Sequence, residues 1–205
     1  MTAVKFCGLR SDLDVQAAIH AGCDLVGLNF VPLSPRYIDI DKSAELVSSF
    51  GSKMLFVGVF KNPTESEVHL ILERIALDFL QFSGDETSNF CDSFDMPYVK
   101  VMHVTETFDF NRERDRFPNA FAYLLDSSSE LGGGSGKTFD WERFPTDSDA
   151  KVILAGGLNP NNVADAVNQL RPWGVDVASG IENDDHSKNR ELMVRFMQGV
   201  RNVSA

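Results

Sequence analysis

The stretch that decides the fold is residues 150–182, AKVILAGGLNPNNVADAVNQLRPWGVDVASGIE. It opens with one apolar run, 150–155, and closes with another, 175–179, and glycine stands at or next to the end of each run. Between the runs, the apolar residues of 163–170 recur at the i, i+3, i+4, i+7 spacing of one helix face. Asn159-Pro160 offers a capping side chain followed by a first-turn proline. The pattern predicts two parallel strands joined by a helix that begins near Asn159.

The same unit repeats along the whole chain. Several apolar runs are nearly continuous, as is typical of parallel strands that are covered on both faces. Helical periods separate them, including 68–75 and a last helix over about 187–203. The segment 109–117 is short and strongly charged, and 139–148 leaves room for only a short helix. The predicted strands cover residues 4–9, 24–30, 53–60, 77–83, 97–104, 120–127, 150–155 and 175–179.

Strand-then-helix units of this kind fit either a closed barrel or an open doubly wound sheet. The placement of glycine favours the barrel, because glycines stand at or just past strand ends, where the loops of a barrel meet at its active face. These glycines are Gly8, Gly84, Gly133, Gly156 and Gly180. No GxGxxG follows the first strand, which removes the main support for a dinucleotide-binding sheet. We therefore expect a single α/β domain over residues 1–205, a (β/α)8 TIM barrel with eight parallel strands.

The composition is that of a globular protein with an acidic balance. The 205 residues include 19 Lys and Arg against 30 Asp and Glu, for a formal net charge of −11. This charge argues against nucleic acid and against an anionic membrane surface as partners. No apolar run approaches the ~20 residues of a membrane span, and no signal-peptide core is visible, so we expect a cytoplasmic protein. The three cysteines are well separated in sequence and predict neither a zinc site nor a disulfide framework.

Two strand ends carry side chains suited to acid–base chemistry. Cys7 lies at the end of the first predicted strand and Asp126 at the end of the sixth, so a barrel brings a thiol and a carboxylate to the same face. Such a pair can serve as general base and general acid. The structural alternatives are a core cysteine and a turn-forming or helix-capping aspartate.

The loops that follow three other strands predict binding groups for anions. Gly156-Gly157 follows strand seven and Ser179-Gly180 follows strand eight, the recurring phosphate site of such barrels, where backbone N–H groups approach the anion. The alternative is a pair of tight turns. In the loop after strand two, Arg36 carries a planar fork of donors that suits a carboxylate, unless it is a solvated surface residue.

Six stretches, in order along the chain, form a recognisable family pattern. They are VKFCGL at 4–9, SPR at 34–36, VGVF at 57–60, GGSGKTFDW at 133–141, AGGLNPNNV at 155–163 and GVDVASGIE at 174–182. Over nearly its whole length the chain resembles the phosphoribosylanthranilate isomerase family of tryptophan biosynthesis. The resemblance implies an Amadori rearrangement of N-(5′-phosphoribosyl)anthranilate to 1-(2-carboxyphenylamino)-1-deoxyribulose 5-phosphate, with no metal and no organic cofactor.

The resemblance also implies a role for each matching residue. Cys7 matches the general base, Asp126 the general acid, and Arg36 the residue that holds the anthranilate carboxylate. The loops that match the phosphate end contribute Gly133, Gly134, Gly136, Gly156, Gly157, Ser179 and Gly180. The implied partner is a small phosphosugar-anthranilate substrate, and we expect a monomer or a homodimer.

Lys5 stands two residues before Cys7 and therefore lies on the same side of its strand. A free thiol titrates near ~8.5, so Cys7 needs help to act as a base at neutral pH, and Lys5 can supply positive potential. Asp176 on the eighth strand is the expected counter-charge, because a buried lysine requires one. A purely structural Lys5–Asp176 pair is the alternative.

The chain departs from the family pattern in two places. The usual Gln-Leu-His-Gly after strand four is here Gln81-Phe82-Ser83-Gly84, in which we expect Gln81 to support the site. After strand eight, Asp185-His186 and Lys188-Asn189 stand where Pro-Gly and Lys-Asp are usual. We expect these changes to affect the rim and the entry to the last helix, and to leave the acid–base pair unchanged.

Two other functions stay open from the sequence. A related barrel, such as the aminoaldose isomerase of the histidine pathway, would carry a carboxylate at the first strand end, where this chain has Cys7. A degenerate barrel would bind phosphorylated ligands without converting them, and the altered Ser83, Asp185 and His186 positions motivate that idea. Retention of both Cys7 and Asp126 argues against it.

Overall fold

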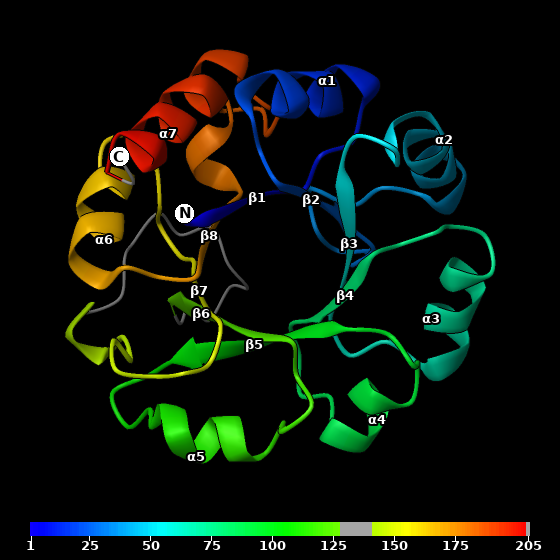
Figure 1. Cartoon of the computed structure of the whole chain (residues 1–205). Coiled ribbons are helices and arrows are strands. Elements are labelled where there is room, and N and C mark those ends of the chain that lie inside the picture. The colour runs from blue at the N-terminus through cyan, green and yellow to red at the C-terminus, as the bar shows by residue number, and fades with distance from the viewer. Residues whose placement is uncertain (128–140, 204–205) are drawn as a thin grey trace.

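Eight parallel strands close into one barrel in the computed structural model, which describes residues 1–127 and 141–203. Each strand pairs with its neighbours in chain order, and the last pairs with the first, so the open-sheet alternative is excluded (Figure 1). Every predicted strand is present, with ends that differ by at most two residues. The strands are β1 (Ala3–Cys7), β2 (Leu25–Asn29), β3 (Leu55–Phe60), β4 (Phe79–Phe82), β5 (Tyr98–Val104), β6 (Ala122–Ser127), β7 (Val152–Leu154) and β8 (Gly174–Val177).

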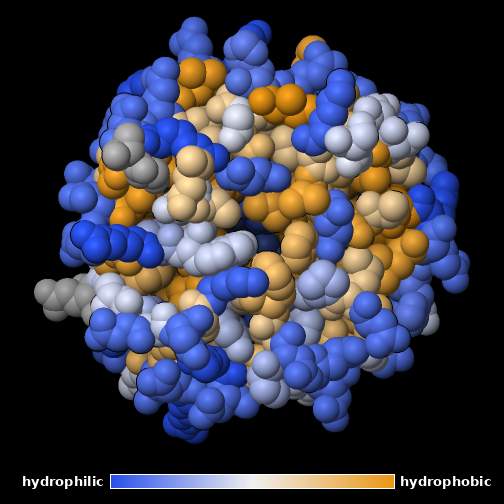
Figure 2. All heavy atoms as spheres, in the orientation of Figure 1, coloured by the Kyte–Doolittle hydropathy of each residue, from blue (hydrophilic) through white to orange (hydrophobic). Residues whose placement is uncertain are grey.

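The helices form a ring outside the barrel (Figure 1). Local sequence signals start several of them: Ser11 and Asp14 form a capping box at α1, and Thr64 and Glu67 form another at α3. Hydrophilic side chains cover this outer ring, whereas apolar ones gather around the barrel axis (Figure 2). The helices are α1 (Asp12–Ala21), α2 (Ile40–Phe50), α3 (Glu65–Leu72), α4 (Ser88–Asp92), α5 (Phe110–Asp115), α6 (Val163–Leu170) and α7 (Arg190–Val203), with short 3-10 turns η1 (Trp141–Arg143) and η2 (Ser179–Ile181).

Two predicted helix starts are wrong by about one turn. The helix expected from Asn159 begins at Val163, because Asn159 Oδ1 accepts from the N–H of Asn161 and holds residues 159–162 in a turn of their own. The last helix begins at Arg190, three residues later than expected. Its cap is Asn189, whose Oδ1 accepts from the N–H groups of the second and third residues of the helix. Since Asn and Asp cap equally well, the change from the family's Asp at this position keeps the helix start.

The core has two parts, and the division positions the site. The larger part lies between the sheet and the helices and contains both Cys23 and Cys91, so these two cysteines are core residues. The smaller part fills the barrel interior beside β5, β6 and β7, with Val99, Val101, Ala122, Leu124, Ile153 and Ala155. Beside β1 and β8 the interior instead contains the buried polar side chains of Lys5 and Asp176. The barrel is therefore apolar on one side and charged on the other.

Candidate active site

A cavity of about 180 Å³ opens at the carboxyl ends of the strands. Residues from all eight strand ends or the loops that follow them line it, as expected for the active face of a barrel. It brings together most of the residues singled out from the sequence: Cys7, Arg36, Gln81, Ser83, Asp126, Gly156, Gly157, Asp176 and Ser179. Asp126, near the end of β6, is partly buried and lines the same cavity as Cys7 from β1.

Lys5 and Asp176 form a buried ion pair next to Cys7. The two residues stand opposite each other in the β1–β8 register, and Lys5 Nζ lies 2.8 Å from Asp176 Oδ1. Their side chains are only 5% and 11% exposed. A methyl group on Gly27 in β2 would lie 2.9 Å from Cys7 Sγ and 3.2 Å from Lys5 Cε, so both side chains pack over the bare backbone of this glycine. The expected counter-charge is confirmed, and Gly27 is a supporting position that the sequence analysis missed.

The protonation of this trio is set by burial and by charge together. Burial alone would lower the pKa of Lys5, but the carboxylate of Asp176 and the nearby Cys7 raise it above its ordinary value. Burial raises the pKa of the Cys7 thiol, while the ammonium groups of Lys5 and Lys188 act against that rise. The expected help from Lys5 is therefore present but is outweighed, and the thiol pKa lies above its usual range.

The SPR turn delivers Arg36 to the cavity. Ser34 Oγ accepts from the backbone N–H of Arg36 and from Asn29 Nδ2, each at 3.2 Å, which ties the turn to the end of β2. The Arg36 side chain then crosses the end of β1 at Gly8, where an added Cβ would lie 2.7 Å from Arg36 Cδ. Gly8 also has a φ of +77°, a left-handed conformation that favours glycine. Both properties explain why glycine follows Cys7.

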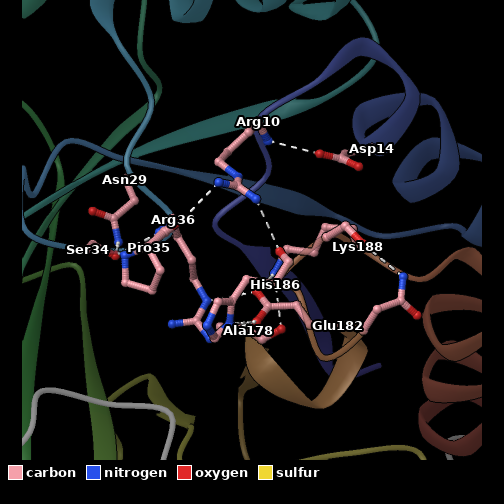
Figure 3. A network of polar contacts seen from close by, with 12 residues as sticks. Arg10, Asp14, Asn29, Ser34, Pro35, Arg36, Ala178, Glu182, His186 and Lys188 are labelled. Atoms are coloured by element: carbon pink, nitrogen blue, oxygen red, sulfur yellow. Dashed lines mark hydrogen bonds and ion pairs between the residues drawn. The ribbon is translucent and has the colours of Figure 1, made fainter.

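Arg36 has a protein partner that the sequence analysis did not foresee. Its Nε donates to Oε1 of Glu182 and its Nη2 to Oε2, each at 2.8 Å, and Glu182 lies in the loop after β8 (Figure 3). Lys188 Nζ donates to the same carboxylate at 2.5 Å and to the carbonyl oxygen of Ala178 at 3.0 Å. Burial would raise the pKa of Glu182, yet Arg36 and Lys188 hold it below its ordinary value. Arg36 is therefore no solvated surface residue.

The two glycine loops use glycine for different reasons. Gly156 and Gly157 line the cavity with φ values of +79° and +68°, so each takes a backbone conformation that other residues rarely adopt. Gly180 is not among the cavity-lining residues; an added Cβ there would lie 1.9 Å from the carbonyl oxygen of Leu158. Glycine at 180 lets the loops after β7 and β8 pack together, while its neighbour Ser179 reaches the cavity. Gly133, Gly134 and Gly136 lie outside the described residues.

The departure at Ser83 lines the cavity, in the loop that follows β4. Ser83 follows β4 and its Oγ accepts from Gln81 Nε2 at 3.4 Å, a long hydrogen bond. Gln81 Oε1 is buried and has no hydrogen-bond partner among the residues that the structure describes. Because an unsatisfied buried acceptor is costly, this atom is suited to receive a donor from a bound molecule.

The departure at His186 has a clear backbone consequence. His186 adopts a φ of +63°, the left-handed conformation that the family's usual glycine takes without steric cost. Its carbonyl oxygen accepts from Arg10 Nη2 at 3.3 Å, and its Nδ1 lies 3.5 Å from Glu182 Oε2 (Figure 3). The loop keeps the shape that a glycine would give it, at the expense of local strain.

Two further properties concern residues 1–127 and 141–203. In this part of the chain, no group of three His, Cys, Asp or Glu side chains is arranged to hold a metal ion. None of the helices there is long and apolar enough to span a bilayer.

Comparison with known proteins gives the family. Residues 4–199 match the family model described as N-(5'phosphoribosyl)anthranilate (PRA) isomerase. The N-(5'-phosphoribosyl)anthranilate isomerase of Pseudomonas savastanoi pv. phaseolicola is 41% identical over 203 residues, which are 98% of each chain. That of Leptothrix cholodnii is 39% identical over 204 residues, or 100% of this chain and 93% of the relative.

Solved structures agree with this assignment. The phosphoribosyl anthranilate isomerase of Thermotoga maritima superposes with a TM-score of 0.90 at 30% identity, covering 98% of this chain and 100% of that one. Another such isomerase, solved with reduced 1-(o-carboxyphenylamino)-1-deoxyribulose 5-phosphate, gives a TM-score of 0.87 at 28% identity, with the same coverage. The chain belongs to the phosphoribosylanthranilate isomerase family.

Proposed function

We propose that this enzyme converts N-(5′-phosphoribosyl)anthranilate to 1-(2-carboxyphenylamino)-1-deoxyribulose 5-phosphate in tryptophan biosynthesis. The observation that carries the proposal is one cavity that contains a thiol, a carboxylate, an arginine and glycine loops in positions suited to acid, base, carboxylate and phosphate contacts. A structural relative bound to the reduced form of this product supports the same substrate.

The reaction needs one proton delivered and one removed. Asp126, as the carboxylic acid, protonates the furanose ring oxygen, and the C1′–oxygen bond breaks to give an open-chain Schiff base. Cys7, as the thiolate, removes the proton from C2′, and the electron pair of that C–H bond forms the enolamine. Tautomerisation of the enolamine gives the aminoketose. Since the pKa of the thiol is raised, the thiolate is a strong base that is sparsely populated at neutral pH.

The substrate is held at both ends in this proposal. Gly156, Gly157 and Ser179 line the cavity where the phosphate would lie, and Gly180 shapes the same loop; Gly133, Gly134 and Gly136 complete the expected set. Arg36 takes the anthranilate carboxylate, and the unpartnered Gln81 Oε1 accepts a hydroxyl of the ribose. Arg36 and Lys188 together with Glu182 leave one net positive charge beside the cavity, which locally opposes the repulsion of an anionic substrate by a protein with a net charge of −11.

The two rival functions have less support. A histidine-pathway type of isomerase would carry a carboxylate at the end of β1, where this chain has Cys7. A barrel that only binds ligands has no need for a thiol and a carboxylate facing one cavity. We further propose that residues 1–205 form one catalytic domain, which acts in the cytoplasm as a monomer or a homodimer. A structural relative from Thermotoga maritima is described as dimeric.

The test is the loss of anthranilate-ester fluorescence when the enzyme is incubated with phosphoribosylanthranilate. Cys7→Ala and Asp126→Asn should each lower kcat by about 10²- to 10⁴-fold, the range of a general base or acid. Cys91→Ala is the matched control, because Cys91 is also a buried free cysteine but packs in the outer core. A Cys7→Ala enzyme with the rate of Cys91→Ala would remove the thiol from the mechanism. If Asp126→Asn changed only substrate affinity, Asp126 would be a binding residue.

A further inference from the structure

We propose that Glu182 is the positioning residue of the carboxylate site: it holds one edge of the Arg36 guanidinium so that the opposite edge faces the substrate's carboxylate. The proposal rests on the carboxylate-binding role of Arg36 proposed above. It concerns a different residue, on a different loop, that never needs to touch the substrate.

The geometry divides the five donors of the guanidinium into two sets. Glu182 accepts from Nε and from Nη2 at 2.8 Å each, which is the side-on edge of the group. The two N–H bonds of Nη1 and the second N–H of Nη2 form the other edge, and this end-on edge can bind a second carboxylate with two parallel hydrogen bonds. One guanidinium can therefore join a protein carboxylate to a substrate carboxylate, which a lysine cannot do.

Burial makes this arrangement rigid. The side chain of Glu182 is 3% exposed and that of Arg36 is 12% exposed, so neither group is free to swing into water. Fixing the guanidinium before the substrate arrives removes an entropic cost that a mobile arginine side chain would have to meet on binding.

Lys188 compensates the negative charge that Glu182 brings to the site. A carboxylate bound to Arg36 would by itself cancel the positive charge that the substrate needs. Lys188, whose side chain is 2% exposed, contacts the same carboxylate at 2.5 Å, so the three groups together carry one net positive charge. Burial lowers the pKa of Lys188 and Glu182 acts against that fall. Removing the Glu182 charge therefore favours loss of the Lys188 proton, which opposes the gain of positive charge at the site.

A second contact fixes the loops independently of Glu182. Arg10, after β1, donates to the carbonyl oxygen of Pro35 at 2.9 Å and to that of His186 at 3.3 Å (Figure 3). The loops after β2 and β8 are thus held together by backbone acceptors as well as by the Arg36–Glu182 pair. A substitution at Glu182 should release the Arg36 side chain while leaving the loop that carries it in place.

The test compares two ligands on each variant of the enzyme. One probe is reduced 1-(o-carboxyphenylamino)-1-deoxyribulose 5-phosphate, and the other is the same molecule with a plain phenyl ring. The measured quantity is the dissociation constant of the phenyl probe divided by that of the carboxyphenyl probe. This ratio reports the carboxylate contact, and changes at the phosphate end cancel in it. In Glu182→Gln this ratio should fall by about ten- to thirtyfold, the gain expected from fixing one arginine side chain in advance. Glu182→Asp, which is one methylene too short to span both nitrogens without movement, should give an intermediate ratio.

The controls separate the possible failures. Glu86→Gln is the matched variant. The Glu86 side chain is 2% exposed, lies outside the cavity and forms an ion pair with Lys100 at 2.7 Å. The ratio for Glu86→Gln should equal that of the unmodified enzyme. Arg36→Ala should abolish the discrimination altogether. If Arg36→Ala leaves the ratio unchanged, the proposed role of Arg36 is wrong. If Arg36→Ala abolishes it while Glu182→Gln and Glu182→Asp keep it, the positioning role of Glu182 is overturned. Should Glu182→Gln fail to fold, Glu182→Asp alone decides between the two outcomes.

Discussion

Lys5 provides a way to separate a catalytic charge from a structural one. Replacing Lys5 alone would leave Asp176 as an unpaired buried carboxylate, which typically destabilises a protein by about 3–5 kcal/mol. Replacing both partners, as in Lys5→Met/Asp176→Leu, removes the pair without leaving a bare charge and is often nearly neutral for stability. The double variant should therefore fold, and its chemistry can be compared directly with that of the unmodified enzyme.

The structure gives the size of the expected effect. A Cβ added to Gly27 would lie 2.9 Å from Cys7 Sγ and 3.2 Å from Lys5 Cε, so these two atoms are within about 6 Å of each other. At an effective dielectric constant of ~20, a unit positive charge about 6 Å from an anion stabilises it by roughly 3 kcal/mol, so the charge of Lys5 matters for the thiolate. Lys5 lowers the pKa of Cys7 and Asp176 raises it by a smaller amount, so removing both side chains should raise the pKa of the thiol further.

The assay is the pH dependence of Cys7 alkylation, followed by mass spectrometry of the labelled peptide. Cys7 lines the cavity, whereas Cys23 and Cys91 pack in the outer core and have pKa values raised to about 12 by burial, so Cys7 should react first. In Lys5→Met/Asp176→Leu the midpoint should move to higher pH, and kcat/KM at neutral pH should fall by about three- to tenfold, because a scarcer thiolate is partly offset by its greater basicity. Lys100→Met/Glu86→Gln alters a second buried ion pair outside the cavity and should leave both quantities unchanged. A Lys5→Met/Asp176→Leu enzyme with the original alkylation profile and rate would show that the pair is purely structural.

Three further predictions concern binding and stability. In steady-state kinetics, Arg36→Ala should lower kcat/KM by about ten- to 200-fold, the effect of losing a charge-assisted contact worth roughly 1.5–3 kcal/mol. Arg36→Lys should recover little of this loss, because one ammonium group cannot bind both Glu182 and the substrate. Crystals grown with phosphate or sulfate should place the ion against the N–H groups of Gly156 and Gly157, and an ion bound reproducibly elsewhere would favour two plain turns. His186→Gly should raise the free energy of unfolding, measured in urea, by about 0.5–1 kcal/mol, because removing the strain of a left-handed non-glycine residue outweighs the entropic cost of glycine. A loss of stability would show that the contact of the imidazole with Glu182 outweighs the strain.

The residues that the sequence located correctly are those whose position follows from closing the barrel. Once β8 must pair with β1, Lys5 and Asp176 have to be neighbours, because both stand the same distance along adjacent parallel strands. Cys7 and Asp126 follow the same logic, since strand ends share one face of a barrel. Strand ends themselves were predicted to within two residues, because glycine and a change of hydrophobic period coincide there.

Contacts between loops follow no such rule. Arg36 and Glu182 are 146 residues apart, and neither the SPR turn nor the GIE segment carries a local signal that pairs them. The direction of the Cys7 pKa shift was equally out of reach, because it is a balance between burial and the charges of Lys5, Asp176 and Lys188, whose distances depend on side-chain packing.

Glycine shows why a correct location does not yet give a correct role. Gly156 and Gly180 both stand just after a strand, and the same anion-binding interpretation was applied to both. In the structure Gly156 is a glycine because its φ of +79° requires one, and this conformation exposes its backbone to the cavity. Gly180 is a glycine because the carbonyl oxygen of Leu158 occupies the space where a Cβ would stand. Gly156 lines the cavity itself, whereas Gly180 lets two loops pack closely enough to bring Ser179 to the cavity. These two uses of glycine can be distinguished only in the folded structure, where the loop that packs against Gly180 is in place.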